Sequence, residues 1–287
     1  MAVTAGAFST WLSTQWLKFL FNNDTFTPLS EFYLALFTGD PGDSSPFSPS
    51  NEVTGLGYAR KACKGNFTSA ASSRIISNST DITFAKALGS WGTVTHWALC
   101  TTDGSTPGEI LVRGAFSSSK TITTNQVAKI LLGDIDIAVT ASGEEGGMNT
   151  VLANEMLDHT FLKDDSGYTR GSMYLALGKL TFGDAGTWDE ENEIANAGNY
   201  ARVNVYSPGI PLNRFGTASS GLVKNNADIS FNSATANWGT VSHWALASSD
   251  TYNAGTMLMW GKWALAQSID IDDQVTILSN QLSISLT

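Results

Sequence analysis

The sequence predicts a mainly β fold, with two tandem antiparallel β-sandwich-like domains that are each preceded by a short N-terminal helix. Three observations predict it: the composition, an internal duplication, and apolar residues that alternate along short segments. The 287 residues include 27 Gly, and only 15% of all residues are charged. Polar turns and strands are typical of such a chain, whereas helical bundles are rich in Ala, Glu, Lys and Leu.

An internal repeat covers nearly the whole chain. The nine residues Trp91–Leu99 recur as Trp238–Leu246, and only Thr95 is replaced, by Ser242. Other landmarks recur in the same order: Tyr33-Leu34-Ala35-Leu36 as Tyr174-Leu175-Ala176-Leu177, Tyr58-Ala59-Arg60 as Tyr200-Ala201-Arg202, and Gly114 as Gly261. This is typical of a duplicated domain rather than of a short solenoid repeat. The Gly- and Glu-rich stretch between the copies predicts a first domain at 1–141, a linker at 142–147 and a second domain at 148–287.

Each copy opens with a helical pattern. In the first copy, apolar residues at three- and four-residue steps form one stripe: Phe8, Trp11, Leu12, Trp16, Phe19 and Leu20. In the second copy, Val151, Leu152, Met156 and His159 follow the same spacing. Asn149 precedes this helix and is predicted to cap its N-terminus.

The segments that follow each helix are predicted to be strands. Along Thr93–Leu99, successive residues alternate between two faces, as in a half-buried strand. Met257–Leu265 predicts a long strand that matches Ile110–Phe116, and the copies are predicted to close with strands at Lys129–Val139 and Val275–Leu286. About six or seven strands per copy, separated by polar turns, predict a sandwich.

The charge balance excludes several partners. There are 16 basic and 26 acidic residues, which gives a net charge of −10. We expect no nucleic-acid partner, because affinity for a phosphate backbone rests on clustered Lys and Arg. No run approaches the roughly 18 apolar residues of a membrane span. A membrane partner is therefore not predicted. No Lys or Arg precedes Lys18, so a secretory signal peptide is not predicted either.

Both copies place a histidine directly before a tryptophan. His96 and His243 have the chemistry of a general base or a metal ligand. Neither is accompanied by a second His or by Cys at ligand spacing, so we predict that both pack in a sheet. The tryptophans of this segment, Trp91 and Trp97 with Trp238 and Trp244, are predicted to be core or interface residues.

The two cysteines are predicted to be buried free thiols. Cys63 aligns with Val205, and Cys100 aligns with Ala247, so the second copy has small apolar residues at both positions. This pattern is typical of structural cysteines. A disulfide between Cys63 and Cys100 stays open at this point.

Acidic residues form two candidate sites. The run Asp189–Glu193 lacks the spacing of a Ca²⁺-binding loop, so a solvated loop is predicted, and ion binding near Asp189 stays open. Asp81 and Asp228 are matched acids at predicted strand starts, where they are expected to cap turns. The motifs of serine hydrolases, nucleotide-binding loops and zinc proteases are absent. We therefore predict no cofactor, no metal and no enzymatic activity.

The ordered landmarks resemble a family of small tailed-bacteriophage virion proteins, usually labelled tail-fibre-like, whose members look like one copy of this unit. The first copy carries the pattern at Tyr33–Thr38, Gly57–Arg60, Asp81–Phe84, Trp91–Ala98 and Gly133–Ile137. The second copy departs from it at Gly178-Lys179 and at Asn280-Gln281-Leu282. The resemblance implies a structural role in the virion, other virion proteins as partners, and no known active site.

The expected function is a non-enzymatic structural component of the virion, associated with the tail, neck or fibre. One alternative is a decoration protein of the capsid. Another is a carbohydrate-binding adhesion module for a host surface glycan, with Trp188, Trp260 or Trp263 stacking on sugar rings. Three chains would supply six similar domains, so a homo-oligomer, a trimer or a hexamer, would suit a junction between threefold and sixfold parts.

Overall fold

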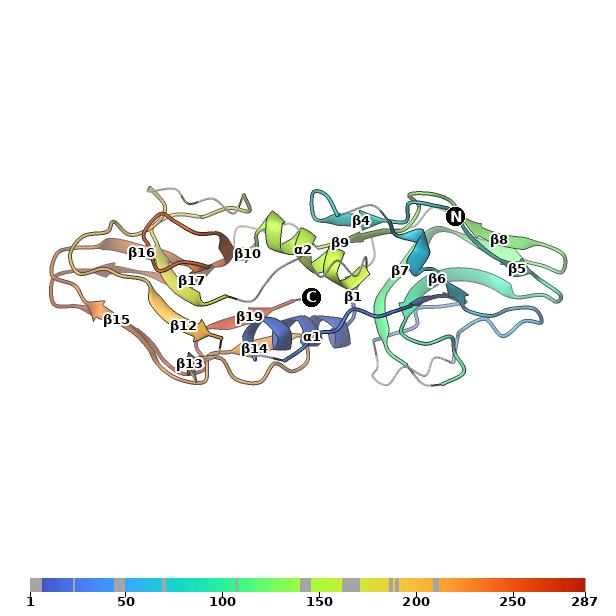
Figure 1. Ribbon diagram of the computed structural model, residues 1–287, viewed down its shortest axis with the longest axis horizontal. Coiled ribbons are helices and arrows are strands. Elements are labelled where there is room, and N and C mark those ends of the chain that lie inside the picture. Colours follow the sequence, from blue (N-terminus) through green and yellow to red (C-terminus); the bar gives the residue numbers. More distant parts are fainter. Residues whose placement is uncertain are drawn as a thin grey trace.

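Two β-rich lobes flank a pair of helices in the computed structural model, and each repeat of the sequence forms one lobe (Figure 1). The structure describes residues 7–22, 24–43, 50–68, 71–106, 108–139, 146–161, 171–185, 188, 191–208 and 212–286. We call residues 7–139 the first repeat and residues 146–286 the second repeat. The mainly β fold class is confirmed.

The two repeats contain the same succession of elements. The first contains β1 (Ala7–Phe8), α1 (Thr10–Phe21), β2 (Tyr33–Phe37), β3 (Lys61–Ala62), the 3-10 turn η1 (Lys64–Asn66), β4 (Ile75–Ser77), β5 (Ile82–Lys86), β6 (Gly92–Cys100), β7 (Ile110–Ile122), β8 (Val127–Ile130) and β9 (Asp136–Ala138). The second contains β10 (Gly146–Met148), α2 (Thr150–Phe161), β11 (Met173–Gly178), β12 (Val203–Ser207), β13 (Leu212–Asn213), β14 (Leu222–Lys224), β15 (Ile229–Ser233), β16 (Gly239–Ala247), β17 (Met257–Ile269), β18 (Gln274–Ile277) and β19 (Ser283–Ser285).

Each repeat has one large antiparallel sheet and two small ribbons. The large sheets have the strand orders β1-β7-β6-β2-β3 and β10-β17-β16-β11-β12-β13. The ribbons pair β5 with β8 and β4 with β9 in the first repeat, and β15 with β18 and β14 with β19 in the second. The central hairpin of each sheet is β6–β7 or β16–β17, and its first strand follows directly after Trp91 or Trp238.

The predicted closing strands are each divided in two. Lys129–Val139 separates into β8 and β9 around Gly133, and Val275–Leu286 separates into β18 and β19 around Asn280. Gly133 has φ of 74° and Asn280 has φ of 66°, a left-handed backbone that reverses the chain. The prediction of six or seven strands was therefore too low, because the described residues form nine strands in the first repeat and ten in the second.

Side-chain caps begin both helices. Ser9 Oγ accepts a hydrogen bond from Leu12 N at 3.1 Å, and Asn149 Oδ1 accepts one from Leu152 N at 2.6 Å. The prediction that Asn149 caps the second helix is confirmed. The predicted stripes were wrong at one residue each: Phe8 lies in β1, and Val151 is 47% exposed. Neither helix in the described part of the chain is long and apolar enough to cross a membrane.

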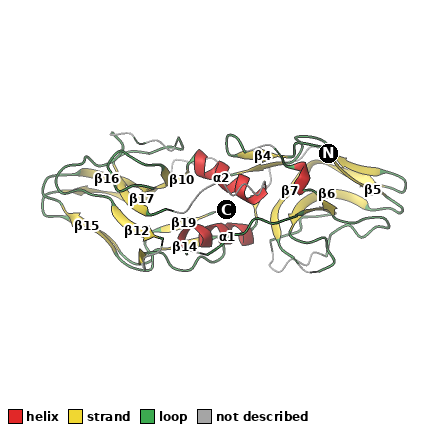
Figure 2. Ribbon diagram, viewed as in Figure 1, coloured by secondary structure: helices red, strands yellow, loops and turns green. Residues whose placement is uncertain are grey.

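Each helix packs against the other repeat. α1 contacts β14 of the second repeat as well as β7 of its own, and α2 contacts β4 of the first. Both helices therefore lie between the two lobes, as Figure 2 shows. The buried apolar side chains of the two repeats form one continuous cluster through this region. The core is consequently shared at the helices and does not stop at the boundary between the repeats.

One side chain joins the residues on either side of the connection between the repeats. Residues 142–145 of the predicted linker lie outside the described residues, whereas Gly146 and Gly147 belong to β10. The side chain of Arg74 binds a carbonyl on each side of this connection. Its Nε donates to Val139 O at 3.1 Å, and its Nη1 donates to Met148 O at 2.6 Å. The division into domains at 1–141 and 148–287 stays a prediction.

Candidate functional site

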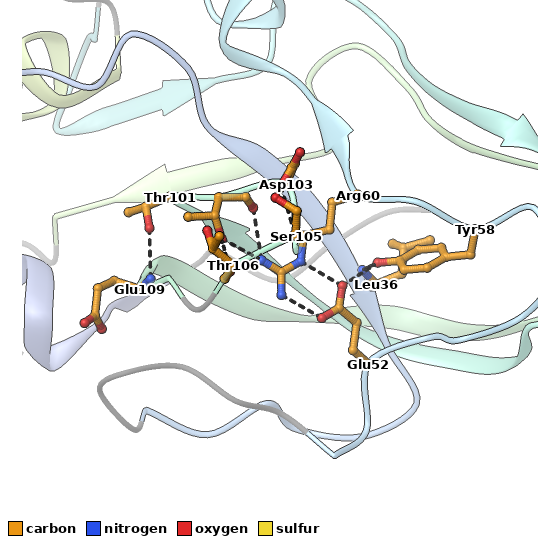
Figure 3. A network of polar contacts seen from close by, with 10 residues as sticks. Leu36, Glu52, Tyr58, Arg60, Thr101, Asp103, Ser105, Thr106 and Glu109 are labelled. Carbon is orange, nitrogen blue, oxygen red and sulfur yellow. Dashed lines mark hydrogen bonds and ion pairs between the residues drawn. The ribbon is translucent and has the colours of Figure 1, made fainter.

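A partly buried ion pair joins three segments of the first repeat (Figure 3). Arg60 binds Glu52 through two hydrogen bonds, Nε to Oε1 and Nη2 to Oε2, each of 2.8 Å. Tyr58 Oη donates to Glu52 Oε1 at 3.1 Å and accepts a hydrogen bond from Leu36 N at 2.9 Å. Planar, two-point pairing of this kind is the strong geometry for a guanidinium and a carboxylate. The cluster holds the segment around Glu52 against the edge of β2.

The same guanidinium reaches the turn between β6 and β7. Arg60 Nη1 donates to Thr102 O at 3.0 Å. Within this turn, Thr102 Oγ1 donates to Thr106 O at 3.0 Å, and Glu109 N donates to Thr101 Oγ1 at 2.9 Å. Figure 3 shows the turn on the opposite side of Arg60 from Glu52. One arginine therefore fixes two surface segments relative to each other.

The second repeat builds the same cluster from matching residues. Arg202 binds Glu193 with Nε to Oε1 at 2.8 Å and Nη2 to Oε2 at 2.7 Å. Tyr200 Oη donates to Glu193 Oε1 at 3.0 Å and accepts from Leu177 N at 3.0 Å. Arg202 Nη1 reaches the equivalent turn at Ser249 O, at 2.8 Å. The cluster is thus a property of the repeated unit.

Sequence reasoning missed the acidic member of each cluster. The prediction of a solvated acidic loop was wrong for Glu193, which is buried against Arg202. Glu191 is exposed as predicted, and Asp189 and Glu190 lie outside the described residues. An alignment of the copies could have found the pair, because Glu193 follows Glu52 by 141 residues, the same spacing that separates Tyr174 from Tyr33.

The tyrosines of the clusters act as hydrogen-bond donors. Burial, together with the neighbouring carboxylate of Glu52, raises the pKa of Tyr58 well above its ordinary value. Burial and Glu193 raise the pKa of Tyr200 in the same way. Both phenols therefore stay protonated and donate to the carboxylates. The arrangement positions loops, because its polar atoms are engaged with one another.

The tryptophans directly before β6 and β16, Trp91 and Trp238, lie in the core. Trp91 Nε1 donates to Leu56 O at 3.2 Å, and Trp238 Nε1 donates to Gly198 O at 2.8 Å. The rings lie edge-on to Tyr58 and Tyr200, with centroids 5.4 Å apart in both repeats. These indoles connect the core to the buried clusters.

Trp97 and Trp244 each lie over a glycine of the neighbouring strand. A Cβ on Gly114 would approach Trp97 to 2.8 Å, and a Cβ on Gly261 would approach Trp244 to 2.5 Å. Both distances are below van der Waals contact. The register therefore requires glycine at these two positions, where Gly114 pairs with Trp97 and Gly261 pairs with Trp244.

The two histidines have hydroxyl partners from the preceding residue. Nδ1 of His96 lies 2.8 Å from Thr95 Oγ1, and Nδ1 of His243 lies 2.8 Å from Ser242 Oγ. Both histidines are within the sheet, at the β6–β2 and β16–β11 pairings. No group of three or more His, Cys, Asp or Glu residues able to hold a metal is present among the described residues.

Both cysteines are free and buried, so no disulfide joins Cys63 and Cys100. Burial raises the pKa of Cys100 to about 12 and raises that of Cys63 as well. Both side chains therefore remain protonated and unreactive at neutral pH. Their counterparts Val205 and Ala247 are also fully buried.

The matched acids cap turns, as predicted. Asp81 Oδ1 accepts a hydrogen bond from Leu132 N at 2.8 Å, and Asp228 Oδ1 accepts one from Ser279 N at 2.8 Å. Asp81 also pairs with Lys129. The capped turns are those that divide β8 from β9 and β18 from β19.

The three tryptophans considered for sugar stacking lie in different surroundings. Trp260 is 3% exposed, so it has no ring face open to a ligand, and this candidate was wrong. Trp188 is covered by the guanidinium of Arg202, 3.8 Å from its ring centre, and packs edge-on against Phe182. Trp263 is half-buried, and its Nε1 donates to His243 O at 3.2 Å.

Trp263 lines a groove of about 610 Å³ along β17, β18 and β19. The register of β16 and β17 shifts between Val241, opposite Gln267, and His243, opposite Lys262, so residues 263–266 of β17 leave the ladder. This bulge presents Leu265, which is 79% exposed, and breaks the alternation predicted for the strand. Gln281 and Thr276 line the groove as well.

The comparisons with known proteins agree with the repeated architecture. The family model described as podophage GP4 fiber I protein gp80 matches residues 7–138 and again residues 147–285. No curated protein matches the chain. The two matched segments correspond to the two repeats and together span most of the sequence. The chain belongs to this family of podophage fibre proteins, whose unit it contains twice.

Proposed function

We propose that this protein is a structural component of a tailed-bacteriophage virion, associated with the tail, neck or fibre, where it acts as a rigid double unit. The observation that carries the proposal is the match of a fibre-protein family to both repeats. The shared core supports it, because the two lobes are joined through packed helices as well as through the chain itself.

The buried clusters support a role in assembly. Each arginine fixes the loop that contains its glutamate and the turn of the central hairpin. Loops that are held in place before binding lose little conformational entropy when they dock, so they form specific contacts at low cost. We propose that these loop surfaces, one on each repeat, bind neighbouring virion proteins.

The duplication supports a proposal about stoichiometry. Each chain presents two similar lobes, so three chains would present six. A trimer could therefore join a sixfold part of the particle to a threefold part. Six chains around one axis would make a hexamer with an inner and an outer ring of lobes.

Gold-labelled antibodies against the protein, applied to purified particles in the electron microscope, test the location. Gold at the tail, neck or fibres is the expected result. Gold over the capsid faces would instead assign the protein to head decoration. Absence from intact particles, checked by mass spectrometry of the same sample, would overturn the structural role.

The groove at Trp263 favours carbohydrate binding as a second candidate function. Its aromatic ring, amide and hydroxyl groups are the kinds of groups that contact sugars, and the ring orientation is fixed by His243 O. Binding on a glycan array should be lost in Trp263→Ala and kept in Leu56→Ala, which changes an exposed apolar residue of the other repeat. Binding that is absent from the wild type, or equal in both variants, would rule out this groove.

A further inference from the structure

The helices are held at one end by their own repeat and along their length by the other. Ser9, which caps α1, donates through Oγ to Ile110 O at the start of β7. Asn149, which caps α2, donates through Nδ2 to Met257 O at the start of β17. From these anchors, α1, which also packs on β7 of its own repeat, crosses to β14, and α2 crosses to β4. The repeats have therefore exchanged their helices.

The exchanged contacts are reciprocal. Phe21 of α1 packs on Phe215 of the second repeat with ring centroids 4.6 Å apart, and Phe161 of α2 packs on Phe67 of the first at 6.1 Å. Each repeat thus packs its own helix against the other repeat and receives the helix of the other repeat on its own surface. This is the pattern of a twofold interface, in which identical patches meet.

The residues directly before β4 and β14, which we call the ribbon corners, form matching hydrogen bonds to the opposite helices. Gly221 N donates to Thr14 Oγ1 of α1 at 2.7 Å, and Arg74 N donates to Asn154 Oδ1 of α2 at 2.7 Å. Gly221 and Arg74 are equivalent residues, 147 positions apart, and both have φ of 69°. A backbone amide of each ribbon therefore binds a side chain of the opposite helix.

Contacts between the two helices complete the interface. Trp16 Nε1 donates to Thr160 Oγ1 at 3.0 Å. The ring of His159 lies 5.5 Å from Trp16 and 5.8 Å from Phe19, centroid to centroid. Trp16, Phe21 and Phe161 are almost completely buried. The interface thus combines buried apolar rings with hydrogen bonds, and the bond from Trp16 to Thr160 is itself buried.

From these contacts we infer that the two repeats are mutually recognising subunits carried on one chain. The helix and ribbon of each repeat form an interaction surface whose partner is a second copy of the same repeat. The covalent connection raises the effective concentration of one repeat near the other, but the exchanged helices hold the pair together. This inference does not depend on where the protein lies in the virion.

Cutting the full-length chain between the repeats tests the inference. Residues 141–145 are replaced by a protease recognition sequence, and the folded protein is cleaved and examined by native mass spectrometry and size-exclusion chromatography. We expect both fragments to remain in one complex with unchanged circular dichroism. Fragments that separate as folded monomers would overturn the inference, and so would fragments that aggregate once the connection is cut.

Two matched pairs of substitutions locate the recognition surface. Phe21→Ala with Phe161→Ala removes both exchanged rings, whereas Phe84→Ala with Phe231→Ala removes buried rings that pack on Tyr58 and Tyr200 within single lobes. In the cleaved protein, the first pair should raise the dissociation constant of the fragments at least about a hundredfold more than the second. If the alanine variants do not fold, the corresponding leucine variants are compared. Equal weakening by both pairs would overturn the assignment.

Discussion

The two repeats build the same Tyr–Arg–Glu cluster but close it to different degrees. The side chains of Glu193 and Arg202 are each 1% exposed, whereas those of Glu52 and Arg60 are 16% and 7% exposed. Trp188 lies over Arg202 and contributes to this difference. The bidentate pair and both tyrosine bonds are nevertheless the same. The comparison teaches that the unit fixes the geometry of the cluster, while the surrounding loops decide how much water reaches it.

The ribbon corners differ in another way. Gly221 adopts φ of 69° at no steric cost, whereas Arg74 has the same φ and bears a side chain there. That side chain binds Val139 O and Met148 O, one on each side of the connection between the repeats, and pairs with Asp184 at 3.2 Å. The strained backbone conformation thus occurs at Arg74, whose side chain connects the two repeats.

The largest effect is expected from breaking the more buried ion pair. Glu193→Gln leaves the Arg202 charge buried without its partner, so it should lower the free energy of unfolding by about 3–5 kcal/mol. Glu52→Gln should cost less, because its cluster keeps some contact with water. Urea unfolding of the two variants measures both losses. Equal losses would mean that burial does not distinguish the clusters.

Removal of the paired core tryptophans should give effects that match between the repeats. Trp91→Ala and Trp238→Ala each remove a buried indole in the same edge-on contact with a tyrosine. Each should lower the free energy of unfolding by about 3–5 kcal/mol, as measured by thermal and urea unfolding. Unchanged stability with impaired particle assembly would instead assign these residues to an interface.

Smaller effects are expected where a methyl group is added beneath a tryptophan. Gly261→Ala and Gly114→Ala should each cost about 1–3 kcal/mol through overpacking. Gly261 should be the more sensitive, because its added Cβ would come closer to the indole, at 2.5 Å compared with 2.8 Å. Differential scanning calorimetry can rank the two. The reverse order would show that the second lobe relaxes more easily.

The smallest effect concerns pH. The hydrogen bond from Lys129, with help from Leu132 N, lowers the pKa of Asp81 from its ordinary 3.8. A carboxyl with a lowered pKa contributes stability that is present above its unfolded pKa and is lost as pH falls through its folded pKa. Asp81→Asn should therefore lower the melting temperature at neutral pH and have no effect once the pH is well below 3.8.

Asp228→Asn is the matched control for this change, because Asp228 caps the equivalent turn and Thr276 stands where the first repeat has Lys129. It should lower the melting temperature less than Asp81→Asn at neutral pH. A loss from Asp81→Asn that persists unchanged in acid would argue against the ion pair and for the shape of the turn.

Features that depend on nearby residues could be predicted from the sequence. The central hairpins follow from alternation and from the repeated nine residues, and the cap at Asn149 follows from its place before an apolar stripe. The buried state of Cys63 and Cys100 followed from the apolar residues at the matching positions. In each case the deciding interactions lie within one copy.

Features that depend on distant partners could not be predicted. The apolar stripe of α1 shows that the helix must be buried, but periodicity carries no information about which repeat supplies the covering ribbon. Glu193 looked solvated because its neighbours in the run are acidic, and its partner Arg202 reaches it only after the chain turns back. Gly146 and Gly147 suggested a linker because glycine favours turns, yet pairing with β17 places them in a strand.

The glycine beneath each indole also has a consequence for the length of the chain. Trp97 and Gly114 are 17 residues apart, as are Trp244 and Gly261, and an insertion or deletion within the paired strand residues between them would place a side chain under the ring. The interval from tryptophan to glycine is therefore the same in both hairpins. The segments before the hairpins differ in length, because the offset between matching residues of the two repeats changes from 141 to 147 residues along the chain. A tryptophan followed by a glycine at this interval is a marker by which further units could be counted in longer fibre proteins.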